Sequence, residues 1–321
     1  MKPAGYLITL SAVLILNFFI PRLMPGDPFT FLSSDPDGVS IVYTPEQIEK
    51  FKGYYGMDKP LTEQFISYFS NLVSGDIGYS IYYNDDVIDV IASRALWTIS
   101  LVIISLSLAG IAGIITGAIS AWFRDHLIDR SLYSFMILFS EIPAFITAII
   151  LLFAGGAWLG WFPLSGGATP FRGYTSGWDK ISDIVMHAVL PVTALVFARL
   201  GEFYLLARSS MITVLSKDYI RTAKGKGLLK RRIIFIHALK NAAPPVVTRI
   251  FISLGTVFGG AILVENVFRY PGAGFLLREA VLVRDYPLIQ GLFLFVAVSV
   301  LIMNFTADML YGKFDPRVRV S

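Results

Sequence analysis

Residues 96–122 read LWTISLVIISLSLAGIAGIITGAISAW, a stretch that contains no Asp, Glu, Lys or Arg. A helix needs roughly 20 apolar residues to cross the hydrocarbon core of a bilayer, which is about 30 Å thick. Lipid offers no hydrogen-bond partners to an open backbone, so a stretch of this kind must cross as a helix. Residues 96–122 therefore predict a transmembrane helix, and with it a membrane protein.

Five further apolar blocks have the length of a membrane crossing, although Arg199 and Glu202 interrupt the third of them. They are Gly5–Leu23, Leu132–Trp158, Ile184–Leu206, Val246–Val264 and Leu288–Leu310. The composition agrees, because 55% of the 321 residues are hydrophobic and 16% are charged, whereas soluble chains have about 25% charged residues. We predict an all-α polytopic membrane protein with six transmembrane helices, which makes a conventional soluble enzyme a poor fit.

The basic residues predict how the chain is oriented, because Lys and Arg are enriched in cytoplasmic loops. Nine of the 27 lie within residues 207–245, while the long polar segment after the first block is mainly acidic. This distribution predicts that both termini are cytoplasmic. It also explains the net charge of +4 as a matter of topology, so no nucleic-acid partner is expected.

These assignments divide the chain into four predicted parts. They are a first transmembrane helix (residues 1–24), a polar extracytoplasmic segment (25–95), a transmembrane core (96–310) that contains the cytoplasmic loop 207–245, and a cytoplasmic tail (311–321). Turn and helix-start signals in the extracytoplasmic segment predict helices over Pro45–Tyr55 and Leu61–Val73.

The cytoplasmic loop predicts a short helix that lies along the membrane face. Ser216 is a favourable N-cap, Asp218 suits a first turn, and Gly227 suits the end of the helix. A second helical segment is expected over Leu229–Asn241, with one face formed by Leu229, Ile233, Ile236 and Lys240. By charge alone, the favoured interpretation is that this basic surface satisfies the positive-inside rule and binds anionic lipid headgroups.

The residue sequence of the loop is a more specific indicator of family than its charge. Tyr219–Leu228 reads YIRTAKGKGL, His237–Ala242 reads HALKNA and Pro244–Thr248 reads PPVVT. This set resembles the coupling loop of ABC importer permeases, and most closely that of the dipeptide and oligopeptide branch, whose other members carry nickel complexes and some oligosaccharides. The generic motif begins Glu-Ala-Ala, whereas Arg221, Thr222 and Ala223 stand there in this chain, as is usual for the peptide branch.

Further stretches resemble the same branch and occur in the same order along the chain. They are Pro25–Pro28, Val264–Gly274, Arg284–Gly291 and Asp315–Arg319. The resemblance implies type I ABC importer permease architecture in the plasma membrane of a bacterium or archaeon. It also implies a second permease subunit, two cytoplasmic ATPase subunits and an extracytoplasmic solute-binding protein as partners.

The resemblance further implies that the short helix docks on an ATPase subunit. The implied contact residues are Asp218, Tyr219, Arg221, Thr222, Ala223 and Gly227. The chain contains no G-x-x-x-x-G-K-[ST] motif, so ATP must be hydrolysed by the partners. No catalytic residue, cofactor or metal site is expected, because protease and hydrolase motifs are also missing from the sequence.

Charged residues inside the apolar blocks are candidates for the translocation path, since an ionised side chain there is costly. The candidates are Glu141, Arg199 and Glu202, although Arg199 and Glu202 are three residues apart and could simply pair with each other. Glu265 and Asn266, at the outer end of the block Val246–Val264, are candidates for a gate or for contact with the binding protein. Two small-xxx-small patterns, Gly113–Gly117 and Gly255–Gly259, predict close helix packing within the subunit or with the partner permease.

Together these features predict a non-catalytic permease subunit of an ATP-driven importer, with di- or oligopeptides as the expected substrate. An importer of nickel complexes or oligosaccharides is the alternative within the branch. A secondary transporter that works without an ATPase is a further alternative, and it would leave the coupling loop without a purpose.

Overall fold

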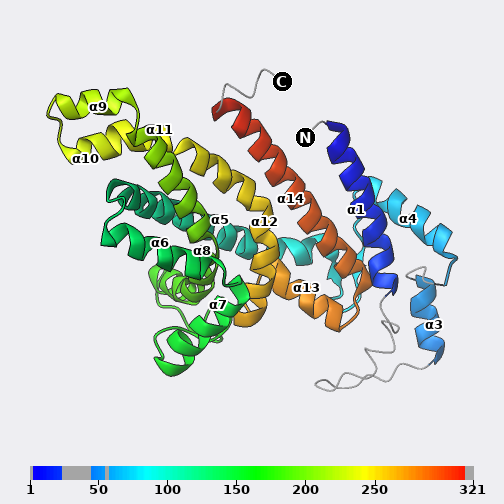
Figure 1. Cartoon of the computed structure of the whole chain (residues 1–321). Helices are drawn as coiled ribbons and strands as arrows, with labels where there is room; N and C mark the ends of the chain where they lie inside the picture. The colour runs from blue at the N-terminus through cyan, green and yellow to red at the C-terminus, as the bar shows by residue number, and fades with distance from the viewer. Residues whose placement is uncertain (1–2, 24–44, 55–57, 315–321) are drawn as a thin grey trace. The chain divides into compact units, whose positions relative to one another are not determined.

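The computed structural model describes residues 3–23, 45–54 and 58–314, and the secondary structure of these residues is almost entirely helical (Figure 1). The described chain forms two compact units. One unit comprises residues 1–96 and 272–299, and the other comprises 97–271 and 300–321. The motif residues Pro25–Pro28 and Asp315–Arg319 lie outside the described residues.

The first unit combines short helices of the polar segment with the beginnings of two long helices. Its elements are α1 (Pro3–Leu23), α3 (Pro45–Tyr54), α4 (Leu61–Val73), the two-residue strands β1 (Tyr79–Ser80) and β2 (Asp85–Asp86), the start of α5 (Val87–Trp122), α13 (Ala273–Leu282) and the start of α14 (Tyr286–Phe314). The strands pair antiparallel, with Tyr79 opposite Asp86. The helices predicted over Pro45–Tyr55 and Leu61–Val73 are confirmed as α3 and α4.

Buried polar contacts and one apolar cluster hold this unit together. Asn17 of α1 donates hydrogen bonds from Nδ2 to the Tyr68 hydroxyl (3.1 Å) and to the Gln290 carbonyl (2.8 Å). Asp285 accepts from the Ser80 hydroxyl at 2.5 Å and from the Tyr82 backbone N–H at 3.0 Å. The apolar cluster brings residues of α5, α13 and α14 together, namely Val87, Val90, Ile91, Ala273, Leu276, Ala280, Leu288, Ile289 and Leu292.

The second unit is built around one long helix, α8 (Gly177–Leu215), which packs on three others. These are α6 (Leu127–Ser140), α7 (Ala144–Leu151), which continues into the π-helix η1 (Leu152–Trp158), and α12 (Pro244–Phe268). Between α8 and α12 the chain forms α9 (Asp218–Gly225) and then α10 (Lys230–Arg232), the π-helix η2 (Ile233–Ala238) and α11 (Leu239–Ala242) in direct succession. We call residues 230–242 the second loop helix.

Four described helices are long and apolar enough to cross a membrane, namely α5, α8, α12 and residues 286–306 of α14. The block predicted over Leu132–Trp158 is instead broken, because α6 and the α7–η1 helix meet at an angle of 100°. Pro143 explains the break, since proline disfavours helical geometry at the residue before it. Counted as one span, this pair gives five, and the described part of α1 adds only a shorter apolar helix over Ile8–Leu23. The predicted number of six is therefore not confirmed.

The glycine pattern in α5 serves packing within the subunit. A Cβ added at Gly113 would lie 2.6 Å from the Phe203 Cβ, and one added at Gly117 would lie 2.8 Å from the Tyr204 carbonyl oxygen. The backbones of α5 and α8 thus approach too closely for any larger residue at these positions. In α12, by contrast, Gly255 faces Asn304 whereas Gly259 faces open space.

Candidate functional site

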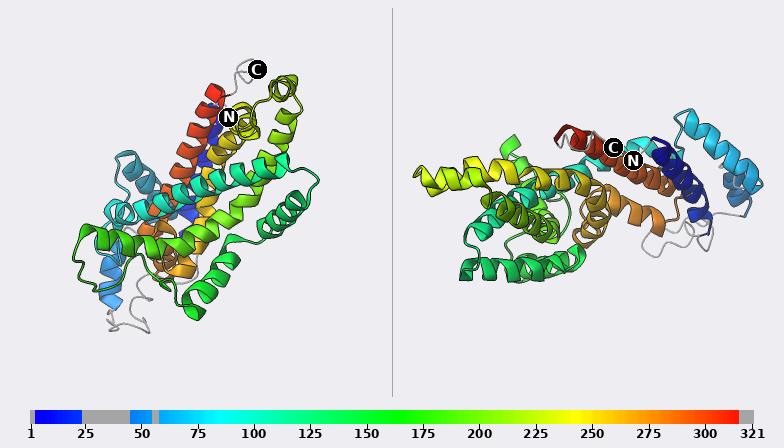
Figure 2. Two further views of the ribbon diagram at one scale, coloured as in Figure 1. Left: turned by 90° about the vertical axis from the view of Figure 1, so that its left-hand side faces the viewer. Right: turned by 45° about the horizontal axis from the view of Figure 1, so that its top comes forward.

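The α9 helix is anchored to the rest of the second unit by its apolar side. Ile220 and Ala223, three residues apart, share one helix face and are buried. They belong to a cluster whose other buried members come from α5, α8 and the second loop helix: Ala118, Ala121, Met211, Ile233, Ala238 and Ala242. Figure 2 shows from two further sides that α9 lies beside the second loop helix. The apolar side of α9 is therefore packed against the ends of α5 and α8.

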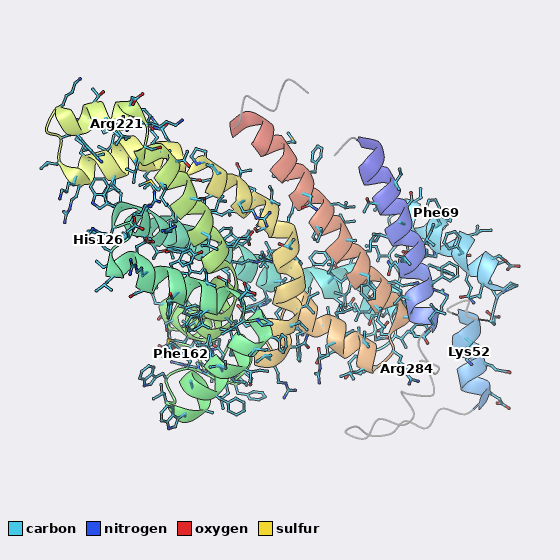
Figure 3. The ribbon with its side chains drawn as sticks, viewed as in Figure 1. Lys52, Phe69, His126, Phe162, Arg221 and Arg284 are labelled. Carbon is cyan, nitrogen blue, oxygen red and sulfur yellow. The ribbon has the colours of Figure 1, made fainter. Side chains whose placement is uncertain are left out.

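The opposite side of α9 is polar and exposed. Asp218, Tyr219, Arg221 and Thr222 are all exposed, and the Asp218 and Arg221 side chains lie 3.6 Å apart. Figure 3 labels Arg221 on α9. We call these four residues the outer face of α9. A solvated polar face above an apolar anchor is suited to contact with another protein.

Two of the predicted contact residues have other positions. Ala223 is only 7% exposed and packs inward, so its side chain belongs to the anchor and not to the outer face. Gly227 follows the helix with φ +70°, and a Cβ there would meet nothing within 4 Å. Glycine at this position satisfies the left-handed geometry with which many helices end.

The helix-start signal at Ser216 was wrong. The helix begins at Asp218 with Lys217 as its N-cap, while Ser216 ends α8 and donates its hydroxyl hydrogen bond back to the Thr213 carbonyl at 2.8 Å. Ser216 is therefore used by the preceding helix.

The predicted face of the second loop helix was also wrong. The four residues do not share one environment, because Ile233 is buried whereas Leu229 and Ile236 are 79% and 55% exposed. A π-helix closes i→i+5 hydrogen bonds, as Leu239 does by donating to the Ile234 carbonyl. This wider turn aligns Ile233 with Ala238, so the α-helical spacing assumed from the sequence does not apply.

A buried ion pair ties α5, α6 and α8 together next to this anchor. Arg208 donates from Nε and Nη2 to the two carboxylate oxygens of Asp129, both at 2.8 Å. The Ser120 hydroxyl also donates to Asp129, and it lies 2.6 Å from the Tyr204 hydroxyl. Although Arg208 counted toward the basic loop in the sequence, its charge is neutralised inside the unit. Sequence spacing gave no sign of this pair, because its members are 79 residues apart.

The break between α6 and α7 lines a cavity of about 290 Å³. Glu141 lies in the break, and Arg199 and Thr256 reach the same cavity from α8 and α12. The remaining lining residues are Ser140, Ile142, Pro143, Ala144, Leu195, Ala198, Val257 and Gly260. The structure thus brings together Glu141 and Arg199, two residues singled out in the sequence.

The third charged candidate, Glu202, lies in a network beside the cavity. It accepts from Arg199 at 3.2 Å and also from Arg249 of α12. Arg199 donates in addition to the Thr256 hydroxyl at 3.1 Å. The predicted pairing of Arg199 with Glu202 is therefore present, but Arg249 shares the same carboxylate. Sequence analysis did not assign Arg249 or Thr256 to the site, because their proximity depends on how α12 packs on α8.

Glu265 lies inside the unit and not on a free surface. Its side chain is fully buried and accepts from the Thr98 hydroxyl at 2.6 Å, which joins α12 to α5. Burial and the nearby Glu265 carboxylate raise the pKa of Tyr270 to about 12. The prediction that Glu265 contacts a binding protein does not fit this burial. Asn266 is partly buried and lines a mainly apolar pocket with Phe145, Leu263 and Val267.

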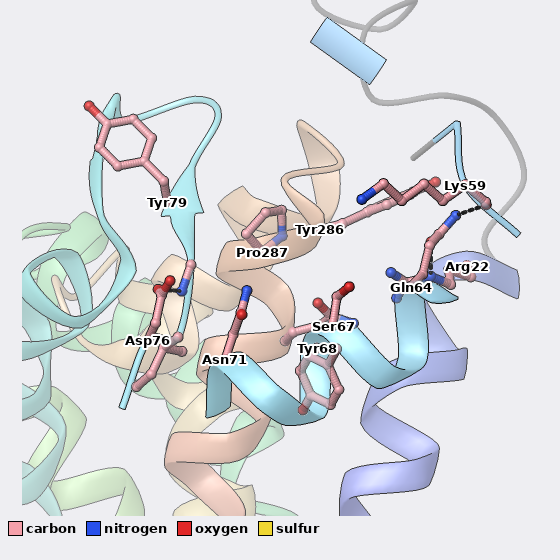
Figure 4. Close-up of a pocket in the computed structure, with 13 residues that line it drawn as sticks. Arg22, Lys59, Gln64, Ser67, Tyr68, Asn71, Asp76, Tyr79, Tyr286 and Pro287 are labelled. Atoms are coloured by element: carbon pink, nitrogen blue, oxygen red, sulfur yellow. Dashed lines mark hydrogen bonds between the residues drawn. The ribbon is translucent and has the colours of Figure 1, made fainter. Parts of the chain in front are cut away.

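A separate cavity of about 450 Å³ lies in the first unit, where α4 faces the start of α14 (Figure 4). Arg22 and Gln64 line it and are joined by a 3.0 Å hydrogen bond, and Lys59, Asp76 and Gln290 also reach it. None of the residues predicted to be functional lines this cavity.

Comparisons with known proteins identify the family. Residues 113–320 match the model of the family described as the binding-protein-dependent transport system inner membrane component. The chain is also 33% identical over 329 residues to the di/tripeptide transport system permease protein DppB of Pseudomonas aeruginosa, covering 98% of this chain and 96% of that protein. This chain belongs to the binding-protein-dependent transport family. It is accordingly a multi-pass membrane protein and a permease component.

Other relatives agree with this assignment. A Brucella suis protein provisionally named a peptide permease is 35% identical over 313 residues, which cover 97% of this chain and 95% of the relative. The fold also matches a chain of the MetNI methionine ABC transporter in inward-facing conformations, with a TM-score of 0.54 and 14% identity. That match covers 71% of this chain and 97% of the solved one. It extends the family assignment to the fold of an ABC importer permease.

Proposed function

We propose that this permease serves an ATP-driven importer of di- or oligopeptides and that α9 couples it to a partner ATPase. The relatives support the substrate, since DppB is named for di- and tripeptides. The arrangement of α9 supports the coupling role, because its apolar side is fixed to three other helical segments while its polar side is free.

The coupling step follows from this anchoring. When the ATPase subunits close on nucleotide, they displace α9 through contacts with Asp218, Tyr219, Arg221 and Thr222. Gly227 provides the turn that ends this helix. Ile220 and Ala223 then transmit the displacement to α5 and α8. The Asp129–Arg208 pair keeps the ends of these helices together with α6. The basic residues around α9 steer the encounter with the ATPase.

The proposed assembly contains a second permease subunit, two ATPase subunits and an extracytoplasmic solute-binding protein. In this assembly both termini and α9 face the cytoplasm, as the positive-inside distribution predicts. Glu141, Arg199 and Glu202 line or border the translocation path. Thr98 and Glu265 hold the outer ends of α5 and α12, and together with Asn266 they form part of the outer gate.

Reconstitution tests this proposal directly. The chain is placed in vesicles with the partner permease, the ATPase subunits and the binding protein, and uptake of radiolabelled dipeptide is measured with and without ATP. We expect uptake only when all components and ATP are present. Uptake by the permease alone, unchanged when the ATPase is left out, would show that the chain is a secondary transporter.

A further inference from the structure

The cavity at the α6–α7 break holds charges of opposite sign apart from each other. Glu141 and Arg199 both line it. No ion pair joins them within residues 58–314, and the Glu141 carboxylate has no hydrogen-bond partner among the described side chains. Arg199 and Arg249 share the single carboxylate of Glu202, so this group carries one excess positive charge. The cavity therefore has an unbalanced negative charge on one side and an unbalanced positive charge on another.

The broken backbone between α6 and α7 also lines this cavity. Interrupted backbone within a membrane span is stable only where it is buried in protein or lines a water-filled cavity. Residues 140–144 line this cavity, and Glu141 and Arg199 give it the charged groups that a charged solute requires there.

We infer that this cavity is a binding subsite for short zwitterionic peptides on their way through the membrane. The free ammonium group of the peptide binds at Glu141, and its terminal carboxylate binds at Arg199, where Thr256 and Glu202 hold the guanidinium in place. This inference rests on the proposed function and adds that the permease itself recognises both ends of its substrate.

The size of the cavity sets the class of ligand. At about 290 Å³ it lies near the lower end of the range for small-molecule sites, roughly 300 to 1,000 Å³. It therefore suits a peptide of two or three small residues better than a long chain. An apolar cavity would reject both termini, whereas this one offers a charged partner to each.

Peptides with one blocked end test the inference. The probes are Ala-Ala, N-acetyl-Ala-Ala and Ala-Ala amide, and their binding to the purified transporter complex without its binding protein is measured by calorimetry. We expect Glu141→Gln to weaken binding of Ala-Ala and Ala-Ala amide by about tenfold, the scale of a lost charge-assisted hydrogen bond, with little effect on the N-acetyl peptide. Arg199→Gln should give the opposite pattern, weakening Ala-Ala and N-acetyl-Ala-Ala but not the amide.

Matched controls separate recognition from folding. Arg199→Lys keeps the charge and should retain most of the carboxylate preference. Glu63→Gln and Arg124→Gln remove exposed charges outside the cavity and should leave all three affinities unchanged. The inference is overturned if the two cavity variants weaken all three probes equally, or if the wild-type complex binds none of them at millimolar concentration.

The same preparations distinguish this inference from the proposed function. ATP-driven peptide uptake could be normal while neither cavity substitution has an effect on affinity that depends on which end of the peptide is blocked. That result would overturn the subsite alone. If the wild-type complex shows no ATP-driven peptide uptake, the proposed function itself is overturned.

Discussion

The buried carboxylate of Asp129 is neutralised by the guanidinium group of Arg208. Its side chain is 5% exposed, and both carboxylate oxygens accept from Arg208. Burying two charges is costly, and removing one partner leaves the other uncompensated, which typically costs about 3–5 kcal/mol. The pair is therefore weak evidence for net stability, but it makes the arrangement of α5, α6 and α8 sensitive to either residue.

Asp129→Asn should destabilise the permease by about 3 kcal/mol, at the low end of that range because Arg208 is partly exposed. Thermal unfolding of the purified complex in detergent measures this loss. The double variant with Arg208→Gln should be less destabilised than the sum of the single variants, because the unpaired charge is then removed as well. Strict additivity of the two changes would contradict the assigned coupling.

Among the elements, α9 ends at a position that requires left-handed backbone geometry. Gly227 has φ +70° and open space where a Cβ would stand. Ordinary residues are strained in this geometry, whereas asparagine tolerates it better than most.

Gly227→Val should therefore abolish transport and co-purification of the ATPase subunits while membrane insertion remains normal. Gly227→Asn is the informative comparison, since it keeps the geometry but adds a side chain. If glycine serves only the turn, Gly227→Asn should retain most of the transport activity. If the ATPase approaches the backbone closely, both variants should lose it. If the Gly227→Val variant transported peptide at the wild-type rate, this would contradict the coupling role proposed for α9.

The packing of α5 on α8 makes a second prediction for the elements. A Cβ at Gly117 would lie 2.8 Å and 2.9 Å from backbone atoms of Tyr204 and Arg208, which cannot easily move. Gly117→Ala should lower stability by about 1–3 kcal/mol, as overpacking generally does. Gly259→Ala in α12 is the matched control, because nothing lies within 4 Å of the added Cβ. Equal melting temperatures for the two variants would argue against the close approach of α5 and α8.

For the whole molecule, the distribution of basic residues predicts an orientation in the membrane with α9 in the cytoplasm and α4 outside. The chain contains no cysteine, so single cysteines can be introduced without a background signal. A cysteine replacing Arg221 should react with a membrane-impermeant maleimide only from the cytoplasmic side. A cysteine replacing Glu63 should react only from outside. Labelling of both from the same side would contradict the predicted topology.

The element types could largely be predicted from the sequence, because they depend on local patterns. Long uncharged blocks must become helices in lipid, and the start signals of α3 and α4 gave their positions to within a residue. The patterns failed where the backbone departed from regular geometry. Pro143 broke an apolar block that is continuous in hydrophobicity, and the π-turns of η2 changed which residues of the second loop helix are buried.

By itself the sequence determined that this chain is a helical membrane protein with a basic loop of importer type. These properties follow from composition and short motifs, which need no knowledge of distant contacts. Only the tertiary structure decided that Asp129 pairs with Arg208, that Arg249 shares the Glu202 carboxylate with Arg199, and that Glu141 and Arg199 line the same cavity. Each of these arrangements brings together residues that are far apart in the sequence, and the packing of the helices, not the order of residues, sets which charges meet.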